Sequence, residues 1–402
     1  MAASLRQFVL KVASRCDLGC DYCYVYRMAD RSFARQPRFM NPATLAITAD
    51  RIAAHAEAHG LRRVSVVLHG GEPLLAGPEY LATAARTIRR RVPADLQVQT
   101  HGGLLDDAML AVLAEHDITV GVSLDGGAAH HDRHRRRADG RGSHEQTVRG
   151  LRRLTSERFR PLFAGLLCVV DTANDPVEVY DELAAFRPPA IDFLLPHGNW
   201  SRPPAPGAYG TWLRQAFDRW YDARPAQTTV RLFEDVIRLA AGGAARGEQV
   251  GLSPAAFVVV DTDGALQQVD TLKSVRAGAM GTGMHVRTHS MDEVLDHPEV
   301  RARRRGLDGL CATCRRCPIV TICGGGSYVH RYREDNGFDN PSVYCADLAA
   351  LIRHVVDRLA GELGPGTSGQ ATASIGRPLR RGGGAARDRR SQTTNPQTTK
   401  PR

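Results

Sequence analysis

Apolar runs alternate with helix-like stretches over the first half of the chain, and this alternation limits the fold more than any other feature. The runs occupy 7–13, 64–69, 96–100, 118–124, 162–170 and 191–195. Helical patterns lie between or after them, at 42–60, 78–91, 105–116, 144–156, 176–186 and 207–223. Strands that are apolar on both faces and separated by helices favour a parallel sheet. Six such units predict an α/β fold, a partial (β/α)6 TIM-like barrel, with a doubly wound open sheet as the alternative.

Small and polar residues gather where these strands are expected to end. In either architecture, ligands bind at the carboxyl ends of the parallel strands. The residues at or just after those ends are Cys16, Gly70, Gly71, Glu72, His101, Ser123 and Asp125. We therefore expect the functional site at this edge of the sheet.

Cysteines fall in two clusters, one near each end of the predicted folded region. Of the nine, eight belong to these clusters: Cys16, Cys20, Cys23, Cys311, Cys314, Cys317, Cys323 and Cys345. The ninth, Cys168, stands in an apolar run, where a free thiol is an ordinary core residue. An odd number of cysteines, tightly clustered and without a secretion signal before them, is typical of metal sites in a cytoplasmic protein.

The first cluster, RCDLGCDYCYVY, has the spacing C-x3-C-x2-C directly after the first strand. Three thiolates in one short loop lack the fourth ligand that closes a structural zinc site. They fit better with a [4Fe-4S] cluster that keeps one iron free of protein ligands. Zinc remains the alternative on spacing alone.

Two motifs together resemble the radical S-adenosylmethionine (SAM) superfamily. Tyr22 precedes the third cysteine of C-x3-C-x2-C, and His69-Gly70-Gly71-Glu72-Pro73 resembles the GGEP motif of that family. The resemblance implies that Cys16, Cys20 and Cys23 hold a [4Fe-4S] cluster whose open iron chelates SAM. Electron transfer from that cluster then breaks the sulfonium bond and gives a 5′-deoxyadenosyl radical.

The same resemblance implies a set of SAM contacts. Tyr22 is expected to contact adenine, and the backbone of Gly70, Gly71 and Glu72 to hold the methionine amino group; glycine also lets a backbone approach a ligand closely. Further candidates are Ser123 near the ribose, Asp125, which is equally suited to capping the next helix, and Arg135. His101 stands where the related QTNG segment has Asn.

The second cysteine cluster resembles the SPASM extension of peptide-modifying radical SAM enzymes, although its spacing alone also permits zinc. The resemblance implies one auxiliary [4Fe-4S] cluster, held by Cys314, Cys317, Cys323 and Cys345. Ser327 replaces a cysteine of the version with two auxiliary clusters, so we expect only one, and Cys311 is left over. Asp270 is a candidate proton acceptor, with a helix or turn cap as the alternative.

Longer segments, such as DTDGALQQVDTLKS, resemble the FxsB-type radical SAM/SPASM maturases, whose precursor peptides end in FXSXX. That resemblance implies cyclophane formation, in which an aromatic ring is joined to a side-chain β-carbon. It also implies an external electron donor of the flavodoxin or ferredoxin type. Thioether formation, decarboxylation and oxidation to formylglycine are alternative chemistries, and a zinc-stabilised binding protein is the alternative from another class.

The resemblance implies a radical SAM barrel over 1–250 and a SPASM-type domain over 251–360, where the pattern predicts a β-hairpin at 256–269. The composition of 361–402 predicts a disordered basic tail. Lys and Arg number 53 against 43 Asp and Glu, a net charge of +10, and the tail carries +6 of it. The remainder is mildly basic, so we expect neither nucleic acid nor a membrane as partner. The basic run at 130–137 is expected to be an ion-paired or solvated loop.

Overall fold

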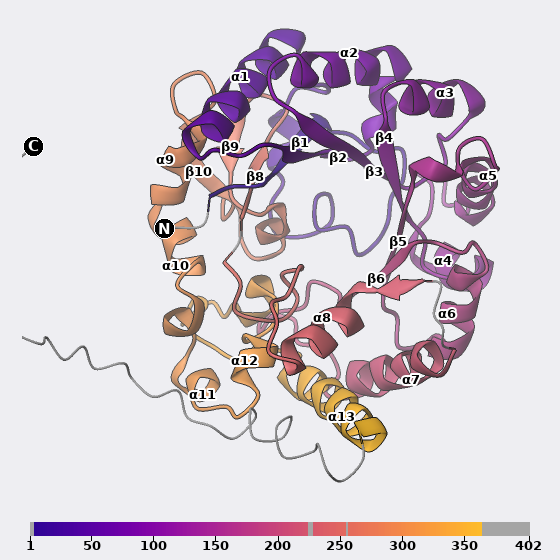
Figure 1. Ribbon diagram of the computed structural model, residues 1–402, viewed down its shortest axis with the longest axis vertical. Coiled ribbons are helices and arrows are strands. Elements are labelled where there is room, and N and C mark those ends of the chain that lie inside the picture. The colour runs from indigo at the N-terminus through magenta and orange to yellow at the C-terminus, as the bar shows by residue number, and fades with distance from the viewer. Residues whose placement is uncertain (1–3, 224–227, 255, 364–402) are drawn as a thin grey trace, which may run out of the picture.

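The computed structural model describes residues 4–223, 228–254 and 256–363. Its first half is a curved sheet of six parallel strands hydrogen-bonded in chain order (Figure 1). The strands are β1 (Gln7–Ala13), β2 (Val64–Gly70), β3 (Ala94–Thr100), β4 (Ile118–Ser123), β5 (Phe163–Val169) and β6 (Ala190–Leu194). Their buried side chains belong to one large core. The predicted α/β partial barrel is confirmed, and the doubly wound alternative is wrong.

Helices ring the outside of this sheet (Figure 1). Those that the sequence predicts are α1 (Pro42–Ala58), α2 (Pro78–Arg89), α3 (Asp107–Glu115), α5 (His144–Leu154), α6 (Pro176–Ala184) and α7 (Ala208–Asp222). Their starts have local causes: Asn41, Asp106 and Asp175 each accept a hydrogen bond from a backbone N–H of the first turn. These caps fix the residue at which each of the three helices begins.

Within the barrel region, two helices and a short strand were not expected. Helix α4 (Ala128–His134) occupies most of the basic run, and α8 (Arg231–Ala240) follows the two-residue strand β7 (Thr229–Val230). The expectation of a loop at 130–137 is therefore wrong, because the chain turns helical after Gly126 and Gly127. The expected ion pairing is confirmed, since Arg133 and His134 both contact Asp171.

The predicted hairpin is present as β8 (Phe257–Val260) and β9 (Ala265–Gln267). Strand β8 pairs in parallel with β1, and β10 (Gly281–His285) pairs with β9. The result is one mixed sheet of ten strands in the order β10-β9-β8-β1-β2-β3-β4-β5-β6-β7. The C-terminal region thus continues the sheet of the barrel and brings the residues that follow β9 beside the end of β1.

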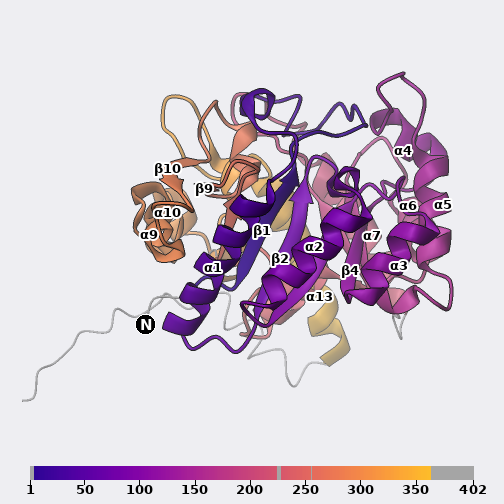
Figure 2. The ribbon, with the colours of Figure 1, turned by 90° about the horizontal axis from the view of Figure 1, so that it is seen from above.

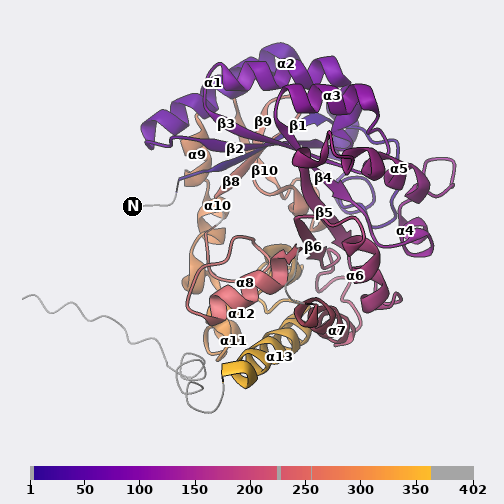
Figure 3. The ribbon, with the colours of Figure 1, turned by 45° about the vertical axis from the view of Figure 1, so that its right-hand side comes forward.

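Short helices complete the C-terminal region: α9 (Met291–Asp296), α10 (Pro298–Arg303), α11 (Ala312–Arg315) and α12 (Val320–Cys323). The final helix, α13 (Cys345–Leu363), packs against α7 (Figure 3). It extends into the region predicted to be a tail, and the rest of that tail lies outside the described residues. No helix in the described part of the chain is both long enough and apolar enough to cross a membrane.

Candidate active site

A cavity of about 370 Å³ lies at the carboxyl ends of the parallel strands. The loop that follows β1, drawn in indigo in Figure 2, lies beyond the ends of the strands and forms part of its wall. Among the predicted site residues, those that line the cavity are Cys16, Cys20, Tyr22, Cys23, Gly70, Gly71, Glu72, Ser123 and Arg135. Asp125 and Asp270 are buried and are bonded to tyrosines of the lining. Residues far apart in the sequence therefore meet in one site.

The cysteine loop is held by backbone contacts to the segment after α4. The N–H of Gly19 donates to the carbonyl of Arg136 at 2.7 Å, and the N–H of Asp21 donates to that of His134 at 3.3 Å. Burial raises the pKa of the Cys20 and Cys23 thiols, so without a metal they stay protonated at neutral pH. A metal centre would supply the positive charge that three thiolates need here.

The spacing of the thiols tests which metal centre fits. Among the described residues, no three cysteine sulfurs lie within 4.8 Å of one another. Thiolates around one zinc, each at about 2.3 Å from the metal, would be about 3.8 Å apart. A cubane holds its thiolates at separate iron corners and therefore suits the wider spacing better.

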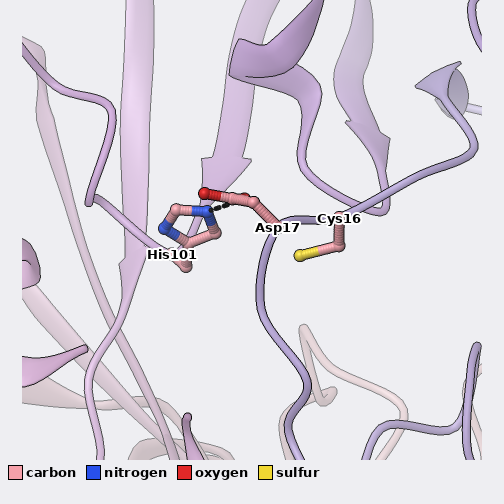
Figure 4. Close-up of side chains that lie close together, drawn as sticks. All are labelled: Cys16, Asp17 and His101. Atoms are coloured by element: carbon pink, nitrogen blue, oxygen red, sulfur yellow. Dashed lines mark hydrogen bonds and ion pairs between the residues drawn. The ribbon is translucent and has the colours of Figure 1, made fainter. Parts of the chain in front are cut away.

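His101 fastens the cysteine loop to the end of β3. Its Nε2 donates to Oδ1 of Asp17 at 2.9 Å, while Nδ1 accepts from the N–H of Gly103 at 3.0 Å. Figure 4 shows the ring of His101 facing the carboxylate of Asp17, beside Cys16. The ring nitrogen, the carboxylate and the Cys16 sulfur lie within 4.8 Å of one another. His101 thus acts on the loop, a contact that the sequence did not predict.

Gly70 and Gly71 are small because the chain itself passes close to them. A Cβ on Gly70 would lie 1.9 Å from the carbonyl oxygen of Ala13, and one on Gly71 would lie 1.9 Å from the Tyr26 hydroxyl. These contacts alone require glycine at both positions, and the close approach of a ligand to their backbone stays a prediction. Both still line the cavity, and their carbonyl oxygens are the backbone groups able to accept from an ammonium group.

The Glu72 side chain links the ends of β2 and β3. Its carboxylate accepts hydrogen bonds from the Thr100 hydroxyl at 2.8 Å and from the backbone N–H groups of Leu74 and His101, both at 2.9 Å. Glu72 is 1% exposed, so its carboxylate serves to hold these two strand ends together. Ser123, at the end of β4, accepts from Nε2 of Gln99 at 3.2 Å.

Asp125 joins two other predicted site residues. Its Oδ2 accepts from the Tyr22 hydroxyl and from Nε of Arg135 at 2.8 Å, while Oδ1 accepts from the N–H of Val169 at 3.0 Å. The Arg135 guanidinium also lies 5.4 Å from the centre of the Tyr22 ring. The alternative of a helix cap is wrong, because the N-cap of α4 is Gly127 and no side chain caps this helix. Asp125 instead fixes the aromatic and cationic walls of the site.

Asp270 lies behind Tyr24, the residue that follows Cys23 in the cysteine loop. The Tyr24 hydroxyl donates to its Oδ2 at 2.9 Å, and Nζ of Lys11 lies 3.5 Å from the same oxygen. Burial alone would raise the pKa of Asp270, but Lys11, His69 and Tyr24 together hold it below the ordinary value. The cap alternative is wrong here too, because no side-chain cap bond starts the 3-10 helix Asp270–Ser274.

Three further histidines line the same cavity: His69, which the sequence analysis named only as part of the GGEP-like segment, His197 and His330. Burial lowers the pKa of His197 to about 4 and that of His330 to about 3, so both rings are neutral at pH 7. Two features of the sequence could have indicated the partners of Asp270. One is a charged residue, Lys11, inside an apolar strand, and the other is an aromatic residue beside Cys23. No feature of the sequence indicated that His330 lines the cavity, because its position depends on how the C-terminal region folds back.

The second cysteine cluster also comes together, through segments around α11, α12 and the start of α13. Burial, followed by the neighbouring thiols of Cys311, Cys323 and Cys345, raises the pKa of Cys314 to about 12. The Arg331 guanidinium donates to the carbonyl oxygens of three consecutive glycines, 324–326, and thereby fixes the turn after Cys323. Cys311 is buried beside this group rather than remote from it.

Comparison with known proteins agrees with this geometry. Residues 10–183 match the sequence model of the radical SAM superfamily. The chain is 22% identical to the cysteine-type anaerobic sulfatase-maturating enzyme of Clostridium perfringens (strain 13), over 88% of this chain and 97% of that one. It is 26% identical to the serine-type enzyme of Klebsiella aerogenes, over 79% of this chain and 78% of the relative.

A solved structure, native anSMEcpe with bound AdoMet, shares the fold with a TM-score of 0.78 at 20% identity, covering 89% of this chain and 99% of that chain. The same protein with AdoMet and the Cp18Cys peptide gives a TM-score of 0.75. Residues 10–183 are thus a radical SAM domain, a class that uses a [4Fe-4S] cluster and SAM, and the chain that carries it is an enzyme. The alternative of a zinc-stabilised binding protein is therefore set aside.

Proposed function

We propose that the protein is a radical SAM/SPASM peptide maturase that crosslinks a ribosomally synthesised precursor through a carbon–carbon bond. The observation that carries this proposal is the buried Tyr24–Asp270 pair, which stands at the wall of the cavity that the cysteine loop closes. Such a pair supplies a proton acceptor close to the radical source, which a crosslink requires and which oxidation to formylglycine requires as well. The chain's similarity to sulfatase-maturating enzymes over most of its length supports a peptide substrate.

Different residues of the cavity would hold the [4Fe-4S] cluster and SAM. Cys16, Cys20 and Cys23 would bind the SAM cluster, and the backbone carbonyls of Gly70 and Gly71 would accept from the amino group of SAM. The remaining predicted SAM contacts are Tyr22, Glu72, Ser123, Asp125 and Arg135, of which Glu72 would act through its backbone. When bound, the cluster and SAM supply a hydrogen-abstracting radical. The apolar lining around Leu167, Leu194 and Val269 would exclude water from it.

Crosslinking then requires the substrate to lose one electron and one proton. The carboxylate of Asp270 is ionised at neutral pH and can accept that proton, with the Tyr24 hydroxyl orienting it. Cys314, Cys317, Cys323 and Cys345 would hold an auxiliary [4Fe-4S] cluster that takes the electron. An external donor of the flavodoxin or ferredoxin type would reduce the SAM cluster for each turnover.

Mass spectrometry of a co-expressed precursor tests the proposal. Crosslinking removes one pair of hydrogen atoms and creates no aldehyde, so the mass falls while hydrazide reagents do not label the product. With Asp270→Asn, we expect 5′-deoxyadenosine to form while crosslinked peptide falls at least about tenfold. The control is Asp263→Asn in the turn of the same hairpin. An unchanged peptide mass with the parent enzyme would show that the proposal is wrong.

Oxidation of Cys or Ser to formylglycine is the second candidate function. The similarity to both cysteine-type and serine-type sulfatase-maturating enzymes favours it. Oxidation of Ser also removes one pair of hydrogen atoms, so mass alone does not separate it from crosslinking. Hydrazide labelling of the product would identify formylglycine, and fragmentation that fails between two residues would identify a crosslink.

A further inference from the structure

A second group of metal-ligating side chains lies outside the barrel, between α1 and α9. His55 stands in the last turn of α1, His59 follows that helix as its C-cap, and Asp292 lies in the first turn of α9. Figures 1 and 2 show α9 beside α1, and the two helices are in contact. Nδ1 of His55, Nε2 of His59 and a carboxylate oxygen of Asp292 all lie within 4.8 Å of one another.

The hydrogen bonding of His55 leaves one ring nitrogen facing the carboxylate of Asp292. Its Nε2 lies 3.1 Å from the carbonyl oxygen of Leu5, which fixes that nitrogen as the N–H donor. Nδ1 then carries a lone pair and faces Oδ1 of Asp292 at 2.9 Å. Within the described part of the chain Nδ1 makes no hydrogen bond, and the side chain is 0% exposed. A lone pair that faces a carboxylate at this distance calls for a cation.

The surroundings favour such a cation. His59 places Nε2 at 2.6 Å from the same Asp292 oxygen, so three donor atoms converge. The C-terminal end of a helix carries a partial negative charge, which adds to the attraction at the end of α1. A histidine that donates its other N–H to a backbone carbonyl, as His55 does to Leu5, is the usual arrangement around a bound metal.

We propose that His55, His59 and Asp292 bind one zinc ion, with water at the open position, and that this ion ties the C-terminal region to α1. Two imidazoles and a carboxylate suit zinc, whereas calcium and magnesium prefer oxygen ligands throughout. Zinc also binds such a site more tightly than Fe²⁺ does. The site is independent of the cavity, so the proposal stands whatever peptide chemistry the enzyme performs.

The test must separate this site from the cysteine clusters, which also bind zinc when empty. Full-length protein is therefore loaded with iron and sulfide under anoxic conditions, stripped of loose metal with EDTA, and then given zinc chloride alone. We expect one zinc to be retained per chain. In its X-ray absorption spectrum, the zinc should have nitrogen and oxygen neighbours at about 2.0–2.2 Å and no sulfur at about 2.3 Å.

Two variants and one matched control complete the test. His59→Ala and Asp292→Asn should each weaken zinc binding at least about tenfold while iron content is unchanged. His59 is about one-third exposed at a helix end, so its removal should leave the fold intact. The control is His116→Ala, because His116 is likewise the C-cap of its helix, α3, and has no carboxylate partner among the ion pairs of the described residues.

Zinc should also raise the thermal midpoint of the parent protein but not that of His59→Ala, because a ligand that binds only the folded state stabilises it. The proposal is overturned if the parent retains no zinc after loading, which would mean that His55 pairs with Asp292 as an imidazolium. It is equally overturned if His59→Ala retains zinc as the parent does, or if sulfur appears in the zinc coordination.

Discussion

At the scale of single residues, the Tyr24 hydroxyl is the contact whose removal isolates proton transfer. It donates to Asp270 at 2.9 Å, and a hydrogen bond to a charged group contributes about 1.5–3 kcal/mol, or about 10- to 100-fold. We therefore expect Tyr24→Phe to lower the rate of peptide modification by that factor while 5′-deoxyadenosine formation continues. The measurement is the ratio of modified peptide to 5′-deoxyadenosine.

The control for this variant is Tyr80→Phe, which removes a hydroxyl that donates to the Met40 carbonyl at 2.7 Å away from the cavity. It should leave the ratio unchanged. Equal losses of both products in Tyr24→Phe would mean that Tyr24 serves cluster or SAM binding instead.

Asp125, which contacts Tyr22 and Arg135, is expected to act on SAM binding. Asp125→Asn removes the charge that holds Arg135 and the Tyr22 hydroxyl in place. We expect the Kd for SAM to rise about tenfold or more in the cluster-loaded enzyme, measured by equilibrium dialysis with labelled SAM. The control is Asp171→Asn, which removes the carboxylate that is ion-paired with Arg133 of α4. An unchanged Kd would limit Asp125 to a structural role.

At the scale of elements, the end of β2 fits against β1 only without side chains. Gly70 has φ +151° and its Cβ would meet the Ala13 carbonyl at 1.9 Å. We expect Gly70→Ala to lower the free energy of unfolding by about 1–3 kcal/mol and to displace the cysteine loop, with a loss of bound iron. Thermal unfolding and iron analysis check this. Gly361→Ala in α13, where the structure has nothing within 4 Å, should cause no loss.

Strand β6 carries a partly buried carboxylate that makes stability depend on pH. Burial raises the pKa of Asp192 to about 6 despite Arg231 at 3.7 Å and a hydrogen bond from Gln249. Because the folded-state pKa exceeds the unfolded value of about 3.9, the folded state favours the protonated form. Stability from this group is therefore present at low pH and is lost as pH rises through about 6, by at most about 3 kcal/mol.

Asp192→Asn should remove this loss. We expect the difference in thermal midpoint, variant minus parent, to be larger at pH 7.5 than at pH 5. The iron content of the two proteins should be equal at both pH values. A difference between the two proteins that does not vary with pH would contradict the assignment to Asp192.

The six barrel strands were predictable because each is apolar on both faces, and their bounds follow from the sequence to within two residues. Helix α4 was not, since its sequence AAHHDRH has no apolar stripe. Helix α8 did carry a signal, in the buried residues Leu232, Phe233 and Val236. The pairs Tyr24–Asp270 and His55–Asp292 join residues more than two hundred positions apart, so only the way the C-terminal region returns to β1 and α1 reveals them.

At the scale of the whole molecule, the second cysteine cluster joins the C-terminal region to the helix that closes the fold. Cys345 is the first residue of α13, which packs on α7 and α8, while Cys314, Cys317 and Cys323 belong to the segments around α11 and α12. A cluster bound by all four would restrain both parts at once. Removing one ligand should therefore affect stability and electron transfer without touching the SAM site.

We expect Cys345→Ser to lower bound iron from about eight to about four per chain. The thermal midpoint should fall, because a ligand of the folded state is lost. SAM cleavage by dithionite should persist, since Cys16, Cys20 and Cys23 are unchanged, while crosslinked peptide should be lost because the electron has no acceptor.

The control is Cys168→Ala, a buried thiol outside both clusters, which should keep about eight irons. Cys311→Ser resolves the remaining alternative: retention of all iron makes Cys311 a neighbour of the cluster, whereas a loss equal to that of Cys345→Ser makes it a ligand. If Cys345→Ser kept both its iron and its crosslinking activity, the auxiliary cluster would have to be held by other residues. The link between α13 and the reaction would then be purely structural.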